Sequence, residues 1–279
     1  APGMAVDVGE EHIFMLLPGP PKELNPMFLN YGKNYLLKKF KSNEYIVSRV
    51  LRFFGIGESQ LETDIEDIIV KQSNPTIAPL AGAYDVTIRI TAKHQSKEKA
   101  NALIDKVEHD ILAKVGDYFY GYDNDSIFSV LFQKLSNKNW SISCAESLTG
   151  GLFAEKLTSL SGSSSIFEGG VVCYSNEVKQ KILGVSSETL SNDGAVSEQT
   201  AIQLAEGIRS IMKTDIGISF TGVAGPNSME NKKVGTVYIG VALPNSQVKC
   251  YTLTIPGSRE TIRERSVRYA CHYLLKELC

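Results

Sequence analysis

The sequence predicts an α/β protein whose C-terminal part is a three-layer domain with a mixed sheet. From Ser126 onward, strand-like and helix-like segments alternate, which is typical of a sheet covered by helices on both faces. Residues 43–122 read β-α-β-β-α, the order of a small α+β sandwich. The 279 residues leave room for both domains and for a fragment of a third. We therefore expect domains over 1–42, 43–122 and 123–279.

Residues 1–42 resemble the closing part of a domain more than a complete one. The apolar run 13–17 predicts a buried strand, and the prolines that follow it favour the start of a helix over 22–40. One strand and one helix cannot bury their own apolar faces. We expect this segment to pack on another domain, to swap between chains or to be the remnant of a truncated domain, and we expect a homo-oligomer, a dimer.

In the middle domain, apolar periodicity places two strands and two helices. Residues 46–53 predict the first strand, and residues 86–91 alternate apolar and polar side chains as a half-buried strand does. The helices are predicted over 58–70 and about 100–111, each with an apolar stripe. The sequence Gly55-Ile56-Gly57 before the first helix fits a phosphate-binding turn, but a plain turn is the favoured interpretation.

The C-terminal domain is predicted to begin after the polar turn at 121–125. Its apolar runs and helical stripes alternate along the chain, and the reactive groups of such a domain gather at the carboxyl ends of its strands. The predicted elements are helix 126–136, strand 140–145, helix 149–160, strand 166–174, helix 176–183, helix 197–213, strands 215–221, 234–243 and 247–255, and a helix from about 258.

The composition argues against several classes of protein. Lys and Arg number 29 against 31 Asp and Glu, a formal net charge of −2, which gives no reason to expect nucleic acid or an anionic membrane as a partner. No apolar run approaches the roughly 20 residues of a membrane helix, and no signal peptide is recognisable. The five cysteines lack CxxC pairing, as in a reducing, cytoplasmic protein. The four scattered histidines predict neither a metal site nor a Ser-His-Asp triad.

One polar stretch, Cys144-Ala145-Glu146-Ser147-Leu148-Thr149-Gly150-Gly151, lies between a predicted strand and a predicted helix. Such a strand-turn-helix can present the Ser147 hydroxyl at the open end of a sheet. Gly150 and Gly151 would let backbone N–H groups at the helix start approach an anion. A Ser/Thr helix cap with glycines that relieve a tight turn fits the stretch equally well.

A nucleophilic serine needs a base, because its hydroxyl is protonated at neutral pH. Lys179 follows the next predicted strand end, five residues after Tyr174, and could reach back over the sheet edge. Its pKa would have to fall from about 10.4 toward 7–8 through desolvation and neighbouring cations. Tyr174 could relay the proton or hold the lysine. The alternatives are a solvated helix lysine and a core or rim aromatic residue.

Five ordered motifs resemble the C-terminal domain of the CinA family. They read AESLTGG, YSNEVK, FTGVAGP, VGTVYIGVA and PGSRETIRERS, and the resemblance covers roughly residues 124–279. The segment from APG to LPGPPKEL is similar to the closing part of that family's molybdopterin-binding-like domain, and 45–120 is similar to its KH-like domain. The resemblance implies a nicotinamide-mononucleotide deamidase, an amidohydrolase with a Ser/Lys mechanism that needs no metal or cofactor.

The resemblance also implies roles for particular residues. Ser147 would be the nucleophile and Lys179 the general base, with Tyr174 beside them. Backbone N–H groups near the two glycines would stabilise the oxyanion, an effect worth about 3–4 kcal/mol per donor in comparable sites. The resemblance leaves the role of Glu146 open between orienting the site and closing a surface ion pair. The residues expected to contact the substrate are Glu146, Thr149, Gly150, Gly151, Thr221, Gly222 and Arg259 or Arg263.

Several alternatives remain beside this interpretation. The same glycine-rich turns fit a nucleotide-binding regulatory protein in which Ser147 and Thr221 only bind a phosphate. Cys144 or Cys173 could be the nucleophile, although both fall in strand patterns and are expected to be buried. The middle domain lacks a G-x-x-G loop, so we expect a structural spacer and no nucleic-acid partner. The ADP-ribose pyrophosphatase activity associated with the family's first domain should be absent from this fragment.

Overall fold

The computed structural model describes residues 1–9, 12–40, 44–245 and 247–278, and the chain forms two compact units. The first unit comprises residues 1–48, 72–76 and 90–108, and the second comprises 49–71, 77–89 and 109–279. This division runs through the segment 43–122, because the two longest strands and the long helix of that segment each contribute residues to both units. Cys279 lies outside the described residues.

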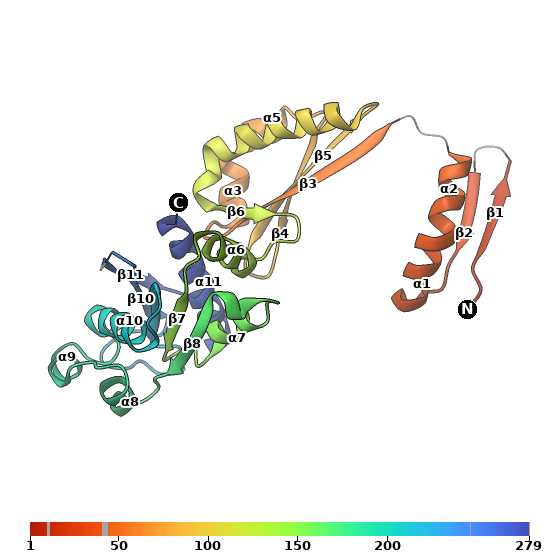
Figure 1. Ribbon diagram of the computed structural model, residues 1–279. Helices are drawn as coiled ribbons and strands as arrows, with labels where there is room; N and C mark the ends of the chain where they lie inside the picture. The colour runs from red at the N-terminus through yellow and green to blue at the C-terminus, as the bar shows by residue number, and fades with distance from the viewer. Residues whose placement is uncertain (10–11, 41–43, 246, 279) are drawn as a thin grey trace. The chain divides into compact units, whose positions relative to one another are not determined.

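The N-terminal segment is a hairpin followed by a helical stretch (Figure 1). Strands β1 (Met4–Val8) and β2 (His12–Leu16) pair antiparallel, and the helical stretch consists of α1 (Pro21–Met27), the π-helix η1 (Phe28–Gly32) and α2 (Lys33–Lys39). The expectation that 13–17 form a buried strand is wrong as to burial. Phe14 and Leu16 are both 58% exposed, because β2 has a single neighbouring strand and one of its faces is uncovered in the described residues.

A four-stranded sheet with the order β4-β5-β3-β6 follows. The strands are β3 (Tyr45–Phe53), β4 (Thr76–Ala81), β5 (Val86–His94) and β6 (Phe119–Tyr122). The single predicted helix over 58–70 is interrupted at Ile65, where α3 (Glu58–Asp64) ends and α4 (Glu66–Val70) begins. The second helix, α5 (Lys97–Val115), is followed by the short 3-10 helix η2 (Gly116–Tyr118). Gly55 has a φ of +89°, as in a plain turn.

The C-terminal part contains a five-stranded mixed sheet with the order β11-β10-β9-β7-β8. Strand β7 (Ile142–Glu146) pairs parallel with β8 (Phe167–Val172) and with β9 (Ile216–Gly222). Strands β10 (Thr236–Ala242) and β11 (Val248–Thr254) extend the sheet antiparallel. The mixed sheet confirms the predicted α/β class.

Helices cover both faces of this sheet. Helix α10 (Glu198–Met212) packs on one face, while α6 (Ile127–Lys138), α7 (Leu152–Thr158) and α11 (Arg259–Glu277) pack on the other and on one another. The short elements η3 (Ser163–Ser165), α8 (Asn176–Lys181) and α9 (Ser187–Asn192) lie in the connections, and α9 was not predicted. The sheet and the helices on its two faces form three layers.

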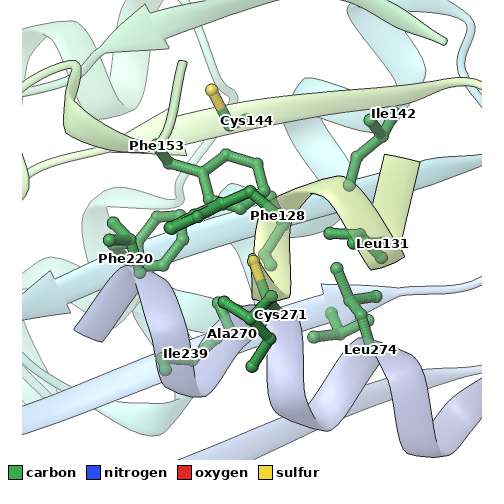
Figure 2. Packing of buried hydrophobic residues seen from close by; sticks show 14 of the residues in the cluster. Phe128, Leu131, Ile142, Cys144, Phe153, Phe220, Ile239, Ala270, Cys271 and Leu274 are labelled. Carbon is green, nitrogen blue, oxygen red and sulfur yellow. The ribbon is translucent and has the colours of Figure 1, made fainter. Parts of the chain in front are cut away.

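The larger core lies between the sheet and α6, α7 and α11 (Figure 2). The rings of Phe153 and Phe220 lie beside each other there, with their centroids 5.3 Å apart. Cys271 extends from α11 into the same cluster and is fully buried. Because β7, β8 and β9 are parallel, their carboxyl ends meet at one edge of the sheet, and this edge positions the candidate site.

Candidate active site

Ser147 and Lys179 lie together at the carboxyl edge of the sheet. Ser147 is the first residue after β7, and its backbone N–H donates to Phe220 O of β9 at 2.9 Å, which holds the start of the turn on the neighbouring strand. Lys179 belongs to α8, whose N-terminus is capped by the Ser175 hydroxyl. The Lys179 Nζ donates to Ser147 Oγ at 3.3 Å and to the backbone oxygen of Cys173 at 2.7 Å.

The environment of Lys179 favours its neutral form. The side chain is only 2% exposed, and burial lowers its pKa because the charged ammonium loses its hydration. Electrostatic interactions with Cys173, Glu230 and Tyr174 oppose this effect. Among the described residues, no carboxylate forms a salt bridge with Nζ. A lysine whose pKa is lowered and whose Nζ contacts a serine hydroxyl has the properties of a general base.

Glu146 holds the turn in place and does not line the cavity beside Ser147. Its carboxylate is 1% exposed and accepts from the backbone N–H groups of Gly151 at 3.0 Å, Phe153 at 3.1 Å and Ala154 at 2.9 Å. It therefore accepts hydrogen bonds from N–H groups at the start of α7 that have no partner within the helix, and its negative charge is favourable at the helix N-terminus. Among the described residues, Glu146 has no ion-pair partner, and the Gly151 N–H that was expected to face an oxyanion already donates to Glu146.

The backbone N–H groups that donate no hydrogen bond belong to the described residues just before Gly151 in the turn. In the described part of the chain, the backbone N–H groups of Leu148, Thr149 and Gly150 donate no hydrogen bond. The Thr149 hydroxyl is also buried without a partner. Arg263 supports this turn by donating to Thr149 O at 2.6 Å. The φ of +59° at Gly150 explains why a glycine stands at this position.

A cavity of about 200 Å³ opens at the Ser147 hydroxyl. It is enclosed by the ends of β7 and β9, by α8 and by two loops that come from distant parts of the sequence. Among the predicted site residues, the cavity is lined by Ser147, Tyr174, Lys179, Thr221, Gly222 and Arg259. Typical small-molecule sites measure about 300–1,000 Å³, so this cavity holds one ring-sized group with the remainder of a ligand outside it.

Thr221 and Gly222 form the floor of the cavity. The Thr221 hydroxyl donates its proton to Ala195 O at 2.6 Å, so it can offer a ligand only an acceptor lone pair. A Cβ at Gly222 would approach Thr236 O to 2.6 Å, so a side chain does not fit there. Both residues shape the site through backbone and packing.

The two candidate arginines occupy different places. Arg259 lines the cavity and donates to Gly225 O at 3.0 Å and to the Tyr174 hydroxyl at 3.4 Å. Arg263 lies outside the cavity and holds Thr149 O. Tyr174 is 65% exposed and stands at the rim, where its hydroxyl meets Arg259 and not the serine. Arg259 is therefore placed to contact a ligand in the cavity, whereas Arg263 supports the turn that follows Ser147.

Sequence reasoning missed a second group of lining residues. They belong to the start of α8, to the turn before α10 and to the long connection between β9 and β10, and no motif in the sequence brings these segments together. The glycine-proline pair in that connection was the one available signal of a shaped loop. The missed residues are Asn176, Ala195, Val196, Asn227 and Met229.

The cysteine alternatives find no support in this geometry. Burial raises the pKa of Cys144 well above its ordinary value and that of Cys173 to about 11, so both thiols stay protonated at neutral pH. His272 lies in α11 against the Phe54 ring, with centroids 5.8 Å apart, and burial lowers its pKa to about 4. Among the described residues, no three His, Cys, Asp or Glu side chains gather as a metal site, and no helix is long and apolar enough to cross a membrane.

Comparison with known proteins places the chain among similar sequences and folds. Residues 124–278 match the family model of the CinA C-terminal domain, and residues 48–121 match that of the damage-inducible protein CinA KH domain. The chain is 55% identical over 278 residues to a competence-damage inducible protein of Geobacillus sp. (strain WCH70) and 52% identical to that of Bacillus cytotoxicus. Each alignment covers 100% of this chain and 67% of the relative.

Solved structures agree over the C-terminal part. The chain resembles a CinA superfamily protein from Enterobacter cloacae with 31% identity and a TM-score of 0.53, covering 56% of this chain and 95% of that one. It resembles the competence/damage inducible protein CihA from Agrobacterium tumefaciens with 35% identity and a TM-score of 0.52, covering 54% and 92%. With two family models and relatives matched over its whole length, this chain belongs to the CinA family.

Proposed function

We propose that the C-terminal domain is an amidohydrolase that converts nicotinamide mononucleotide to nicotinic acid mononucleotide and ammonia. The observation that carries the proposal is the buried Lys179 Nζ at 3.3 Å from Ser147 Oγ. This pair supplies a nucleophile and a base at the mouth of a ring-sized cavity. The substrate rests on the resemblance of the five motifs to the family's deamidase domain.

The chemistry is acyl transfer in two halves. Neutral Lys179 accepts the proton of Ser147 as Oγ forms a bond to the carboxamide carbon. The tetrahedral intermediate collapses when the C–N bond breaks and Lys179 returns the proton to the departing ammonia. Lys179 then takes a proton from water as the water oxygen bonds to the carbon of the Ser147 ester. The bond from this carbon to Ser147 Oγ breaks, Lys179 returns the proton to Oγ, and the acid product leaves. The second Lys179 contact, to Cys173 O at 2.7 Å, keeps Nζ pointed at the serine.

Charge that develops on the carbonyl oxygen needs donors in place before the reaction. The N–H groups of Leu148, Thr149 and Gly150 follow Ser147 in the turn and are proposed as donors to the oxyanion; of these residues, Leu148 lines the cavity. Of the two glycines that the sequence suggested for this role, Gly151 is not available because its N–H donates to Glu146. The turn is rigid because Glu146 and Arg263 fix it at two points.

The nucleotide phosphate is proposed to bind outside the cavity, at Arg259. Its guanidinium lies at the rim beside Tyr174, and an arginine matches a phosphate with two parallel hydrogen bonds. A cavity of about 200 Å³ has room for the pyridine carboxamide and leaves the ribose and phosphate toward this rim.

The test is ammonia release from nicotinamide mononucleotide, measured without added metal, with the acid product identified by mass spectrometry. Ser147→Ala should lose at least about 10³-fold in kcat. Ser210→Ala, an exposed serine on α10, is the matched control and should retain full activity. Full activity in Ser147→Ala would overturn the assignment of Ser147 as the nucleophile. Tight nucleotide binding without turnover by the unaltered protein would favour the regulatory alternative.

A further inference from the structure

The connection between β9 and β10 folds as a closed hairpin over the cavity. Its base is paired by Val223 N to Thr236 O and by Gly235 N to Val223 O, each at 2.8 Å. Near its tip, Met229 and Lys232 exchange backbone hydrogen bonds around a turn. We call residues 223–235 the cap hairpin. Its residues Asn227 and Met229 line the cavity that holds Ser147 and Lys179.

The side chain of Glu230 attaches the tip of the cap hairpin to the body of the domain. Glu230 Oε1 accepts from Ala195 N and Glu230 Oε2 accepts from Val196 N, both at 3.0 Å. Both of these donors belong to residues that line the cavity. Gly194 precedes them, and a Cβ there would clash with the Glu230 carboxylate. The turn at 194–196 is therefore shaped to receive this carboxylate.

The turn is anchored to the body of the domain from its other side. Thr221 donates to Ala195 O at 2.6 Å, and Thr200 and Ser197 donate to Gly194 O at 2.7 and 3.0 Å. The turn thus cannot follow the hairpin if the hairpin moves. Glu230 joins a long, exposed loop to a fixed point in the domain, with two charge-assisted hydrogen bonds.

We propose that Glu230 is a positioning residue that latches the cap hairpin onto the 194–196 turn and so completes the wall of the cavity above Ser147 and Lys179. Its effect on catalysis rests on the proposed amidohydrolase function. The latch itself is a statement about the hairpin and is tested without substrate. Positive φ angles at Glu230 (+49°) and Asn231 (+58°), costly for residues other than glycine, are held where the carboxylate docks.

Glu230 also acts on the base. The groups that raise the pKa of Lys179 against the effect of burial are Cys173, Glu230 and Tyr174. Removal of the Glu230 charge makes the lysine ammonium less stable, so the pKa of Lys179 falls further. A residue with a purely structural role would not move this pKa.

Limited trypsin digestion tests the latch directly, because the cap hairpin contains the cleavage sites Lys232 and Lys233. Glu230→Gln replaces one acceptor oxygen with an amide NH₂ that faces a backbone N–H. We expect cleavage after Lys232 or Lys233, followed by mass spectrometry, to be about tenfold faster in Glu230→Gln than in the unaltered protein. Glu177→Gln, an exposed glutamate on α8, is the matched control and should leave this rate unchanged. Equal rates in Glu230→Gln and the unaltered protein would overturn the latch.

Kinetics separate the two effects of Glu230. In Glu230→Gln, kcat/KM for nicotinamide mononucleotide should fall about tenfold, and the acid limb of the pH–kcat profile should move to lower pH. Glu230→Asp keeps the charge but loses reach, so it should release the hairpin to trypsin with a smaller move of the limb. An acid limb that stays in place in Glu230→Gln would contradict the action on Lys179. If the unaltered protein shows no turnover, the proposed function fails, while the trypsin result still decides the latch.

Discussion

The replacement Glu146→Gln distinguishes between substrate contact and support of the turn. The sequence placed Glu146 among the substrate-binding residues, whereas its carboxylate accepts three backbone N–H groups at the start of α7. A glutamine keeps the oxygen shared by Gly151 and Phe153 but presents NH₂ to Ala154 N. One buried N–H is then left without an acceptor, and the helix N-terminus loses its negative charge.

The size of the effect follows from these contacts. A buried, unsatisfied N–H costs about 1–3 kcal/mol, and the lost charge at the helix N-terminus about 1 kcal/mol. Together they predict a loss of about 2–4 kcal/mol in the free energy of unfolding. For a domain of this size, that corresponds to a fall in Tm of roughly 5–12 °C.

Thermal unfolding followed by tryptophan fluorescence is the assay, because the one tryptophan, Trp140, packs against the core of this domain. Glu155→Gln is the control, since Glu155 lies in the first turn of the same helix but its side chain is 60% exposed. An unchanged Tm in Glu146→Gln together with a raised KM would refute the reasoning and return Glu146 to the substrate.

Three further outcomes are expected. Arg259→Ala should raise KM for the nucleotide by about tenfold or more with a smaller change in kcat. Arg263→Ala should lower kcat, because the turn loses its contact at Thr149 O. Steady-state kinetics of both variants test these outcomes, and a loss of kcat in Arg259→Ala with a raised KM in Arg263→Ala would contradict them. The lowered pKa of Lys179 predicts that kcat rises with pH as the lysine loses its proton, with an inflection below 10.5; a pH profile without this rise would exclude a neutral lysine as base. The pKa of His272 is about 4 in the folded state and 6.5 in the unfolded state, so below pH 6.5 only the unfolded state binds the extra proton, and the free energy of unfolding decreases as the pH is lowered. At pH 5 the loss is about 2 kcal/mol relative to pH 7. Urea unfolding at the two pH values should show this loss in the unaltered protein and not in His272→Phe.

Much of the fold could be predicted because its signals are local. Alternation of apolar runs and helical stripes defined most of the C-terminal elements and the mixed sheet. The short strand β6 and the six-residue helix α9 were missed because they are too short to show a period. The burial expected for β2 failed because burial depends on what covers a strand, and the run itself carries no information about the cover.

The candidate site could be predicted from the sequence only where its signals are local. Ser147 and Lys179 each follow a strand end, so the rule for parallel strands brought them together, and the structure places them in contact. Tyr174 follows the same strand end yet stands at the rim, where its hydroxyl accepts from Arg259, a residue far along the chain. The contact of Glu230 with the 194–196 turn joins two loops through side chain and backbone, and no spacing in the sequence predicts it. The homodimer, the cytoplasmic location and the domain boundaries stay predictions.

The central claim is that Lys179 acts as the base for Ser147, and Lys179→Met tests it most directly. Methionine has a similar length and removes the amine without burying a new charge. The measurement is kcat for ammonia release from nicotinamide mononucleotide at saturating substrate, with nucleotide binding followed separately by calorimetry. A general base of this kind contributes about 10²–10⁴-fold, so we expect a loss of that size with binding retained. A variant that keeps kcat within about threefold of the unaltered protein would contradict the account.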